Sequence, residues 1–261
     1  MATAQTINAQ QQVPQELLDA VANASHIVVF TGAGVSAESG IATFRDAERE
    51  ALWQRFDPMR LASAEGFLAD PALVWGWYCA RRQQLRQASP NPGHRAIAEL
   101  GQRAPRVEVI TQNVDDLHER AGSEKVTHLH GEIFQSRCFD CGEPAELAER
   151  TQIPDEHGRL DPPRCTRCGG PIRPGVVWFG EMLPEQAMNH AYNAAMQCDL
   201  LVSVGTSGVV YPAAELPKLA HDNGALVIHV NPERPPVVCE RDWCLLGQAG
   251  HWLPRLFSAG R

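Results

Sequence analysis

The sequence predicts an α/β fold, a Rossmann-like parallel sheet with helices on both faces that carries two insertions. Short apolar runs rich in Val and Ile alternate with helical patterns, and most of these runs are continuous rather than alternating. Continuous runs are typical of strands buried on both faces, and a repeated strand-helix order is typical of parallel sheets. A glycine-rich turn after the first run and two C-x-x-C pairs complete the pattern.

The composition narrows the class of protein. A chain of 261 residues can bury the core of one large domain with smaller insertions. Its formal net charge of −8 argues against non-specific binding to nucleic acid or to an anionic membrane. The sequence contains no membrane-spanning apolar stretch and does not begin like a signal peptide. We therefore expect a cytoplasmic protein with no membrane partner.

Each element can be placed along the chain. Residues 1–13 are polar and rich in glutamine, so we expect a flexible tail there. Buried strands are predicted at 26–30, 107–111, 125–130, 200–205 and 225–230, with helices at 93–100, 183–198 and 212–223. The sheet domain is expected to comprise 14–36, 91–131 and 176–261. A helical insertion at 37–90 and a small cysteine-bearing domain at 132–175 interrupt it.

The turn TGAGVSAESG spans residues 31–40. Gly32, Gly34 and Ala37 fit the G-x-G-x-x-G/A spacing of dinucleotide-binding folds. Glycine lets the backbone approach closely, and the N–H groups that begin a helix attract phosphate. The turn alone is equally compatible with a structural connection.

The two C-x-x-C pairs predict a metal site. Cys138, Cys141, Cys165 and Cys168 resemble a four-cysteine zinc ribbon. A redox dithiol is the rival interpretation, but it needs only one pair. Four thiolates fill the coordination sphere of zinc, so the ion is expected to be structural. The other four cysteines are expected to be small buried apolar residues, namely Cys79, Cys198, Cys239 and Cys244.

Polar residues follow the predicted strands at their carboxyl ends. Gln112, Asn113 and Asp115 follow the second strand, although an Asn/Asp turn would also explain them. His130 ends the third strand, where a core residue or a metal ligand is the alternative to a base. Small or polar residues also follow the fourth and fifth strands, in VGTS and HVN. Ligands of open α/β sheets bind at this edge, so together these residues favour one nucleotide cleft.

The ordered set of motifs resembles the sirtuin family of NAD-dependent protein-lysine deacylases. It comprises GAGVSAESGIATFR at 32–45, TQNVD at 111–115, HG at 130–131, the two C-x-x-C pairs, VVWFGE at 176–181, GTS at 205–207 and HVN at 229–231. The resemblance implies NAD as co-substrate, one structural zinc ion and acylated-lysine proteins or peptides as substrates. It also implies 2′-O-acyl-ADP-ribose and nicotinamide as products.

The resemblance assigns roles residue by residue. Residues implied to bind NAD are Gly32, Ala33, Gly34, Glu38, Phe44, Arg45, Gln112, Asn113, Asp115, Gly205, Thr206, Ser207, Asn231 and Ala249. Among them Asp115 would accept from the carboxamide, and Phe44 would shield the reacting ribose carbon. His130 and Asn113 are the implied catalytic residues. A neutral imidazole with a pKa near about 6.5 suits His130 as the general base that takes a proton from the ribose hydroxyl.

Two segments are implied to contact the substrate. VVWFGE could be a buried strand on sequence grounds alone, but in the family it is an exposed edge that pairs with the peptide backbone. Its implied contact residues are Val177, Trp178, Phe179, Gly180 and Glu181. A helix is predicted at 70–87, with Asp70 as its N-cap and Pro71 in its first turn.

Tyr78 and Arg81 lie three residues apart on one face of this predicted helix. Helical spacing alone makes Arg81 a solvated surface charge. Tyr-x-x-Arg here resembles the sirtuins that remove succinyl and malonyl groups, because arginine and a tyrosine hydroxyl can bind the terminal carboxylate. The small Ala37 would leave the acyl pocket wide. Acetyl is a further candidate acyl group.

One segment departs from the family pattern, and three other functions compete. After TFR the family has a glycine-rich loop, whereas this chain has DAEREALW, which puts its NAD contacts in question. The rival functions are a mono-ADP-ribosyltransferase, a hydride-transferring dehydrogenase and an NAD-sensing module without enzymatic activity. Tyr78 and Arg81 argue against the first, and His130 argues against the last.

Overall fold

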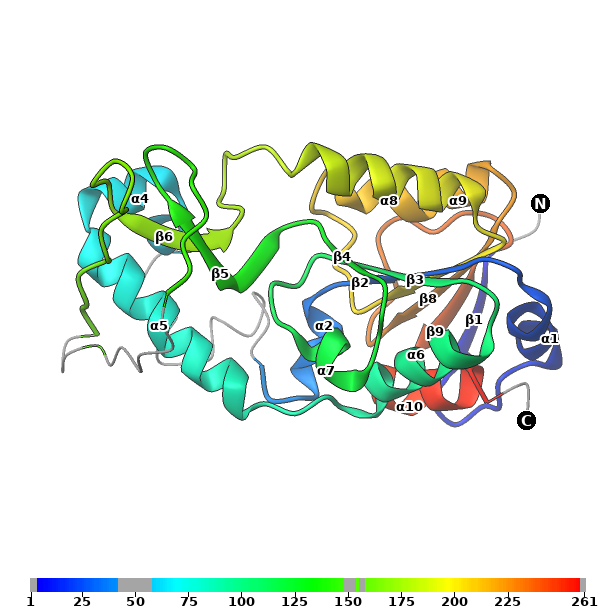
Figure 1. The fold of residues 1–261 in the computed structure, drawn as a ribbon. Coiled ribbons are helices and arrows are strands. Elements are labelled where there is room, and N and C mark those ends of the chain that lie inside the picture. The colour runs from blue at the N-terminus through cyan, green and yellow to red at the C-terminus, as the bar shows by residue number, and fades with distance from the viewer. Residues whose placement is uncertain (1–3, 42–57, 148–153, 155–157, 259–261) are drawn as a thin grey trace. The chain divides into compact units, whose positions relative to one another are not determined.

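The computed structural model describes residues 4–41, 58–147, 154 and 158–258, which belong to two compact units (Figure 1). The sheet unit comprises residues 1–40, 89–129 and 184–261, and the insertion unit comprises 41–88 and 130–183. The two insertions predicted as separate pieces thus fall in one unit. Residues 176–183 also belong to it, although the sequence suggested the sheet domain. No helix in the described part of the chain could cross a membrane.

The sheet unit is built on a seven-stranded parallel sheet with the strand order β1-β9-β8-β7-β2-β3-β4. The order reverses between β2 and β7, the switch point at which doubly wound sheets bind ligands. The strands are β1 (Gln5–Asn8), β2 (Ile27–Thr31), β3 (Val107–Thr111), β4 (Val126–His128), β7 (Leu200–Val204), β8 (Leu226–Asn231) and β9 (Trp243–Leu246).

Helices cover both faces of this sheet, as the sequence predicted. Figure 1 shows α8 and α9 on one face and α6 and α10 on the other. The helices of the unit are α1 (Gln15–Asn23), α2 (Ala33–Ala37), α6 (Pro92–Arg103), α7 (Leu117–Ala121), α8 (Glu185–Gln197), α9 (Leu216–Asp222) and α10 (Ala249–Leu256), with a 3-10 turn at Ala213–Glu215. The predicted helices at 93–100, 183–198 and 212–223 are confirmed.

The core explains why four of the five predicted strands are correct, whereas the strand predicted at 125–130 is limited to 126–128 and is half-buried rather than buried. Every residue of β2 and of β7 is buried, because helices cover the sheet on both sides. Val29, Val202 and Ile228 on neighbouring strands belong to one cluster with residues of α1, α6 and α10. Continuous apolar runs can be buried in this way only by such layers.

The expectation of a flexible tail is wrong for Gln5–Asn8. These residues form β1, which pairs with β9 in parallel, with Gln5 opposite Trp243. The side chain of Ile7 is buried, and Arg234 donates a hydrogen bond of 3.1 Å to the hydroxyl of Thr6. Backbone pairing with a sheet edge, which composition does not reveal, offsets the entropy of ordering this polar segment.

In its described residues, the insertion unit combines three helices with a two-stranded antiparallel sheet. Its elements are α3 (Pro58–Leu61), α4 (Ala64–Ala69), α5 (Pro71–Gln87), β5 (Gly131–Cys138) and β6 (Ile172–Val176). Arg82 of α5 donates to the carbonyl oxygens of Ile133 and Gln135 at 2.6 and 2.8 Å. These bonds lie where the register of β5 shifts, and they explain why the two insertions fold together.

The segment 177–181 is not the buried strand that its apolar residues suggested. β6 ends at Val176, and beyond it Phe179 forms only an isolated bridge to Ser63. Trp178 is buried, but Phe179 is 49% exposed. One side of the segment therefore faces solvent.

Candidate active site

The glycine-rich turn brings two loops of the sheet unit together at the switch point. Gly32 follows β2 and donates 3.0 Å to the carbonyl of Val204, and Gly34 donates 2.9 Å to that of Gly205. A Cβ on Gly34 would lie 2.7 Å from the Cα of Gly205, and one on Gly205 would lie 2.4 Å from the amide nitrogen of Val35. Gly205 also has φ +62°. The glycines thus serve close backbone packing between β2 and β7, as well as any ligand approach.

The other predicted residues of this edge occupy the neighbouring strand ends. The Thr206 hydroxyl is buried 3.2 Å from that of Ser203, and Ser207 accepts from the amide of Val209 at 3.5 Å. Asn231 ends β8, and its side chain donates 3.1 Å to the carbonyl of Glu233. Gly205 donates to Val230 at 2.9 Å, which ties the loop after β7 to β8. Three strand ends therefore contribute to one edge.

Ser36 joins the glycine turn to the residues that follow β3. Its hydroxyl donates 3.0 Å to Oδ2 of Asp115 and accepts 3.0 Å from the side-chain amide of Asn113. All three side chains are buried. Sequence reasoning missed Ser36, although its place inside the GAGVSAESG motif was a signal. The structure thus brings Asn113 and Asp115 together, as predicted, through a third residue.

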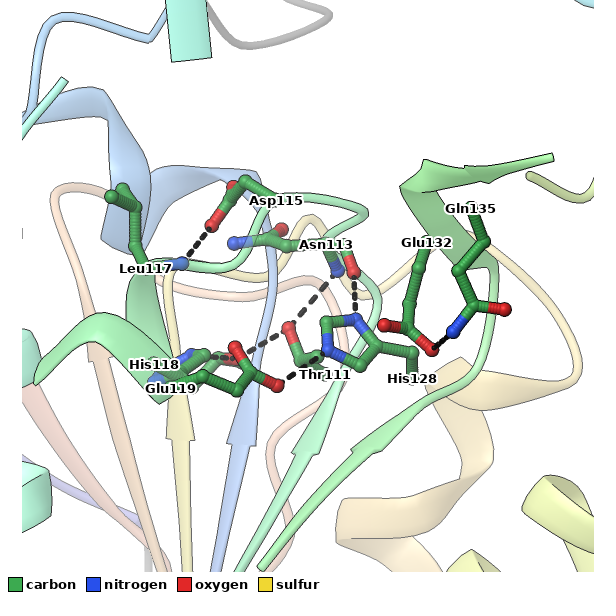
Figure 2. Close-up of polar contacts among 10 residues, drawn as sticks. Thr111, Asn113, Asp115, Leu117, His118, Glu119, His128, Glu132 and Gln135 are labelled. Carbon is green, nitrogen blue, oxygen red and sulfur yellow. Dashed lines mark hydrogen bonds and ion pairs between the residues drawn. The ribbon is translucent and has the colours of Figure 1, made fainter. Parts of the chain in front are cut away.

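The carboxylate of Asp115 is held in a defined orientation. Figure 2 shows its Oδ1 accepting from the backbone N–H of Leu117, at 3.2 Å. Burial raises the pKa of Asp115 above its ordinary value, whereas the hydrogen bonds from Leu117 and Ser36 lower it. A desolvated carboxylate with fixed donors is a strong acceptor for a further N–H group.

His128 supports the backbone of Asn113. Its Nδ1 lies 2.8 Å from the carbonyl oxygen of Asn113, and its Nε2 lies 2.8 Å from Oε1 of Glu119 on α7 (Figure 2). The backbone N–H of Asn113 also donates a hydrogen bond of 3.0 Å to the hydroxyl of Thr111. The imidazole of His128 is therefore engaged on both nitrogens.

Asn91 is a second residue that sequence reasoning missed. Its Oδ1 caps α6 by accepting from Gly93 and His94, and its amide donates 2.7 Å to the carbonyl of Val35 and 3.0 Å to the hydroxyl of Ser39. It therefore fixes α2 against the beginning of α6. A helix-capping Asn before Pro was the available signal.

Glu38 and Ala249 meet at the beginning of α10. Both carboxylate oxygens of Glu38 lie within 3.2 Å of the amide nitrogen of Gly250, the residue after Ala249. A carboxylate at a helix N-terminus is favoured by the unpaired N–H groups and the dipole. The structure therefore gives Glu38 a contact that stabilises α10. The backbone N–H of Gln112 donates a hydrogen bond of 2.9 Å to the carbonyl oxygen of Thr31, which holds the end of β3 beside β2.

The remaining predicted residues lie in the insertion unit. His130 begins this unit, and its carbonyl oxygen accepts from the amide of Val177 at 2.8 Å. Gly131 has φ +74°, and a Cβ on it would lie 2.2 Å from the carbonyl of Gly175. Glycine is therefore required directly after His130. Phe44, Arg45 and DAEREALW lie outside the described residues.

Tyr78, which was predicted to contact the acyl group, is buried beside Trp178 of the predicted peptide-pairing segment. The indole N–H of Trp178 donates 3.0 Å to the Tyr78 hydroxyl, and burial raises the pKa of Tyr78 above its ordinary range. The guanidinium of Arg173 lies 3.4 Å from the centre of the Trp178 ring and pairs with Glu181. Arg81 donates 3.2 Å to Oε1 of Gln84, one turn further along α5.

The four cysteines of the two C-x-x-C pairs converge at one end of the β5-β6 hairpin. Their sulfur atoms lie within 4.8 Å of one another, with separations of 3.4 Å for Cys138–Cys168, 3.5 Å for Cys141–Cys168 and 3.8 Å for Cys141–Cys165. Sulfurs on a tetrahedral zinc ion lie about 3.8 Å apart, given Zn–S bonds of about 2.3 Å. The cluster fits a structural zinc ion.

Comparison with protein families and sequences identifies relatives over nearly the whole chain. Residues 32–212 match the model of the Sir2 family. The chain is 54% identical over 241 residues to NAD-dependent protein deacylase 1 of Pseudomonas aeruginosa, a match that covers 92% of this chain and 96% of that protein. It is 53% identical over 249 residues to an NAD-dependent protein deacylase of Methylococcus capsulatus, covering 94% and 96%.

Solved structures agree with these matches. A Sir2 homologue in complex with NAD aligns with a TM-score of 0.87 at 40% identity, over 98% of this chain and 95% of that chain. Sir2Tm bound to a propionylated peptide aligns with a TM-score of 0.76 at 29% identity, over 93% and 96%.

Proposed function

Because the chain belongs to the Sir2 family, we propose that its deacylase activity acts on succinyl-lysine and malonyl-lysine, with acetyl-lysine as a further substrate. The chain is an NAD-dependent protein deacylase with NAD as co-substrate, and its four-cysteine cluster is consistent with one structural zinc ion. The acyl preference and the roles of individual residues below form the proposal.

The buried Tyr78–Trp178 hydrogen bond is the observation that carries the acyl preference. A hydroxyl group has one donor and two acceptor positions, so a Tyr78 that accepts from Trp178 retains its own O–H as a donor. The raised pKa of Tyr78 keeps that phenol neutral and able to donate. A carboxylate at the end of an acyl chain needs such a donor and a cation in an otherwise apolar pocket.

Arg81 supplies the cation in this proposal. It lies three residues after Tyr78 on α5, and residues at this spacing share a helix face. Its contact with Gln84 is to a neutral amide oxygen. Arginine binds a carboxylate through two parallel N–H groups. An acetyl group lacks the carboxylate and would gain nothing from this contact.

The strand ends of the sheet unit are proposed to bind NAD. The glycine-rich turn after β2, which packs tightly against Gly205, is proposed to present its backbone to the pyrophosphate. Thr206, Ser207 and Asn231 supply hydroxyl and amide groups for ribose. The buried carboxylate of Asp115, held by Ser36 and Leu117, is proposed to accept from the nicotinamide carboxamide.

His130 is proposed as the general base. NAD supplies a glycosidic bond whose cleavage makes removal of the acyl group favourable. The chain's own part is to hold the acyl oxygen near that bond and to take a proton from a ribose hydroxyl. A neutral imidazole with an ordinary pKa of about 6.5 can do so near neutral pH.

The segment 177–181 is proposed to pair with the substrate backbone. The N–H groups of Val177, Trp178 and Phe179 already donate within the insertion unit, to His130, Glu181 and Ala62. A peptide strand would therefore pair through the carbonyl groups of this segment and the N–H of Gly180. Main-chain pairing would allow many substrate sequences.

Three peptides of one sequence, carrying succinyl-, malonyl- or acetyl-lysine, test the proposal. Each is incubated with NAD and the products are followed by mass spectrometry. We expect free lysine peptide, nicotinamide and O-acyl-ADP-ribose from all three, with kcat/KM for the two acidic acyl groups at least about tenfold higher. Turnover of the acetyl peptide alone would overturn the acyl preference. ADP-ribose attached to a protein side chain, or NADH absorbance, would favour the rival enzymes.

A further inference from the structure

A second group of metal-ligating side chains lies in the sheet unit, outside the proposed active site and the four-cysteine cluster. Ligand atoms of His221, Cys239 and Asp242 all lie within 4.8 Å of one another. His221 lies in the last turn of α9, whereas Cys239 and Asp242 belong to the connection between β8 and β9. Cys239 is half-buried rather than buried as the sequence suggested, so its thiol is accessible to an ion.

Asp242 is the centre of this group. Its side chain is 3% exposed, and its Oδ1 lies 2.9 Å from Nδ1 of His221. Its Oδ2 accepts 2.7 Å from the backbone N–H of Cys239 and lies 3.2 Å from Nε2 of His229. A carboxylate removed from water to this degree requires compensating positive charge or several donors.

His229 adds an independent indication of a ligand. The ring is 3% exposed, and its Nδ1 has no hydrogen-bond partner among the described residues. A cavity of about 20 Å³ is lined by His229, Cys239 and Asp242, and its far side reaches Thr206, whereas His221 does not line it. One water-sized particle needs about 10–15 Å³ of such volume. The space beside Cys239 and Asp242 therefore accommodates one ion or water molecule.

We propose that His221, Cys239 and Asp242 bind a divalent cation of borderline softness, for which Zn²⁺ is the probe. Imidazole, thiolate and carboxylate are the three ligand types that zinc takes in proteins, at about 2.0–2.3 Å. Tetrahedral ligands at these distances lie about 3.3–3.8 Å apart, so the longest separations need to close by about 1 Å, whereas His221 and Asp242, now 2.9 Å apart, need to open slightly. A water molecule or His229 takes the fourth position.

The local charge favours a cation. Asp242 supplies a buried negative charge, and Lys218, which lines the same cavity one turn before His221 on α9, pairs with Asp222 at 2.5 Å, which offsets its positive charge. On binding, the Cys239 thiol releases its proton to solvent, and the proton that Nδ1 of His221 donates to Asp242 moves to Nε2, which leaves the Nδ1 lone pair for the metal. The bound ion would join α9 to the β8-β9 connection. His229, which offers a fourth ligand, lies two residues before Asn231 on β8. This proposal does not depend on the acyl preference.

The test uses the full chain with its four-cysteine cluster loaded with zinc. After equilibration with Zn²⁺ and removal of excess ion, elemental analysis counts the metal per chain, and calorimetry measures the affinity of the second ion. We expect two equivalents for the wild type. Cys239→Ser and His221→Asn should bind the second ion at least about tenfold more weakly. Replacing a residue that only hydrogen-bonds to a metal ligand already lowers metal affinity by about tenfold or more.

Two controls make the result specific. His190→Gln removes another histidine of the sheet unit, one that pairs with Glu108 at 2.7 Å, and should leave two equivalents. Co²⁺ added to the zinc-loaded chain should produce a thiolate charge-transfer band that Cys239→Ser removes. The proposal is overturned if the wild type holds one equivalent at Zn²⁺ concentrations on the order of 100 μM. It is equally overturned if the second ion binds Cys239→Ser and His221→Asn as tightly as the wild type, since that identifies an adventitious surface ion.

Discussion

The indole N–H of Trp178 donates a 3.0 Å hydrogen bond to the hydroxyl of Tyr78, and both side chains are buried. This bond joins α5 to the segment after β6 inside the insertion unit. It positions the hydroxyl and also satisfies a donor that would otherwise lie without water or a partner. The same hydrogen bond therefore contributes to the stability of the insertion unit and to the proposed acyl specificity.

Replacing Tyr78 with Phe should separate these two roles. The substitution leaves the Trp178 N–H buried and unpaired, so the free energy of unfolding should fall by about 1–3 kcal/mol. The kcat/KM for succinyl peptide should fall further than that for acetyl peptide. Urea denaturation and peptide kinetics measure both effects. Tyr192→Phe, on α8 of the sheet unit, is the matched control and should change stability by less than about 0.5 kcal/mol.

Replacing Arg81 with Met should affect acidic acyl groups selectively. Removing a charge-assisted partner of the carboxylate should lower kcat/KM for succinyl peptide by about 10- to 100-fold, corresponding to roughly 1.5–3 kcal/mol. Acetyl turnover should change little. Arg86→Met on the same helix, where Arg86 lies 5.6 Å from the Phe134 ring, is the control and should preserve the ratio of activities. Equal loss of succinyl and acetyl turnover in Arg81→Met would contradict the assignment.

Replacing Gly34 with Ala should damage the sheet unit, whereas the same change at Gly101 should not. The new Cβ at position 34 would lie 2.7 Å from backbone, which cannot move without opening the β2-β7 edge. We expect a loss of about 1–3 kcal/mol of stability, together with weaker NAD binding. A Cβ on Gly101 in α6 would have no atom of the described residues within 4 Å, its own helix left aside. Gly101→Ala should therefore raise the free energy of unfolding by about 0.5–1 kcal/mol. Thermal unfolding with and without NAD compares the two.

The stability that Asp70 provides should depend on pH. Asp70 caps α5 and accepts two hydrogen bonds from Arg159, at 2.6 and 2.7 Å. The hydrogen bonds from Arg159 are the largest cause of the lowered pKa of Asp70 in the folded chain. The unfolded carboxyl, with a pKa of about 3.9, therefore takes up its proton first as pH falls. The stabilisation is complete above about pH 5 and is lost as pH falls through the folded pKa.

Asp70→Asn isolates this effect because Asn caps a helix about as well as Asp. We expect the variant to be less stable by about 0.5–1 kcal/mol at pH 7, the value typical of exposed ion pairs, and the gap to close towards pH 3. Urea denaturation across this range measures the gap. In an Arg159→Gln background the same substitution should have little effect at any pH. A difference in the free energy of unfolding that stays constant with pH would instead show that the helix cap, and not the ion pair, is its cause.

Local patterns determined much of the fold. The strands at 107–111 and 200–204 were predicted to within a residue because a strand buried on both faces must be apolar at every position. The N-cap at Asp70 could be predicted because helix capping is a local interaction. The side chain of Asp70 accepts from the N–H of Leu73, only three residues further along the chain. The four-cysteine cluster followed from the short spacing inside each pair.

Pairing between distant segments could not be predicted in this way. β1 is polar and becomes a strand only because β9, which was also missed, presents an edge to it. Segment 177–181 is apolar like a buried strand, yet its exposed side becomes apparent only when β6 is seen to end at Val176. Composition gives no information about which sheet edges remain open.

By itself the sequence determined the parallel sheet, its covering helices, the zinc ligands and the family, because each depends on residue type at short, regular spacing. Only the tertiary structure placed Ser36 between Asn113 and Asp115 and brought His221 to Cys239 and Asp242. Such contacts form between side chains far apart in the chain, and burial makes them strong by removing competing water. No local pattern encodes that proximity.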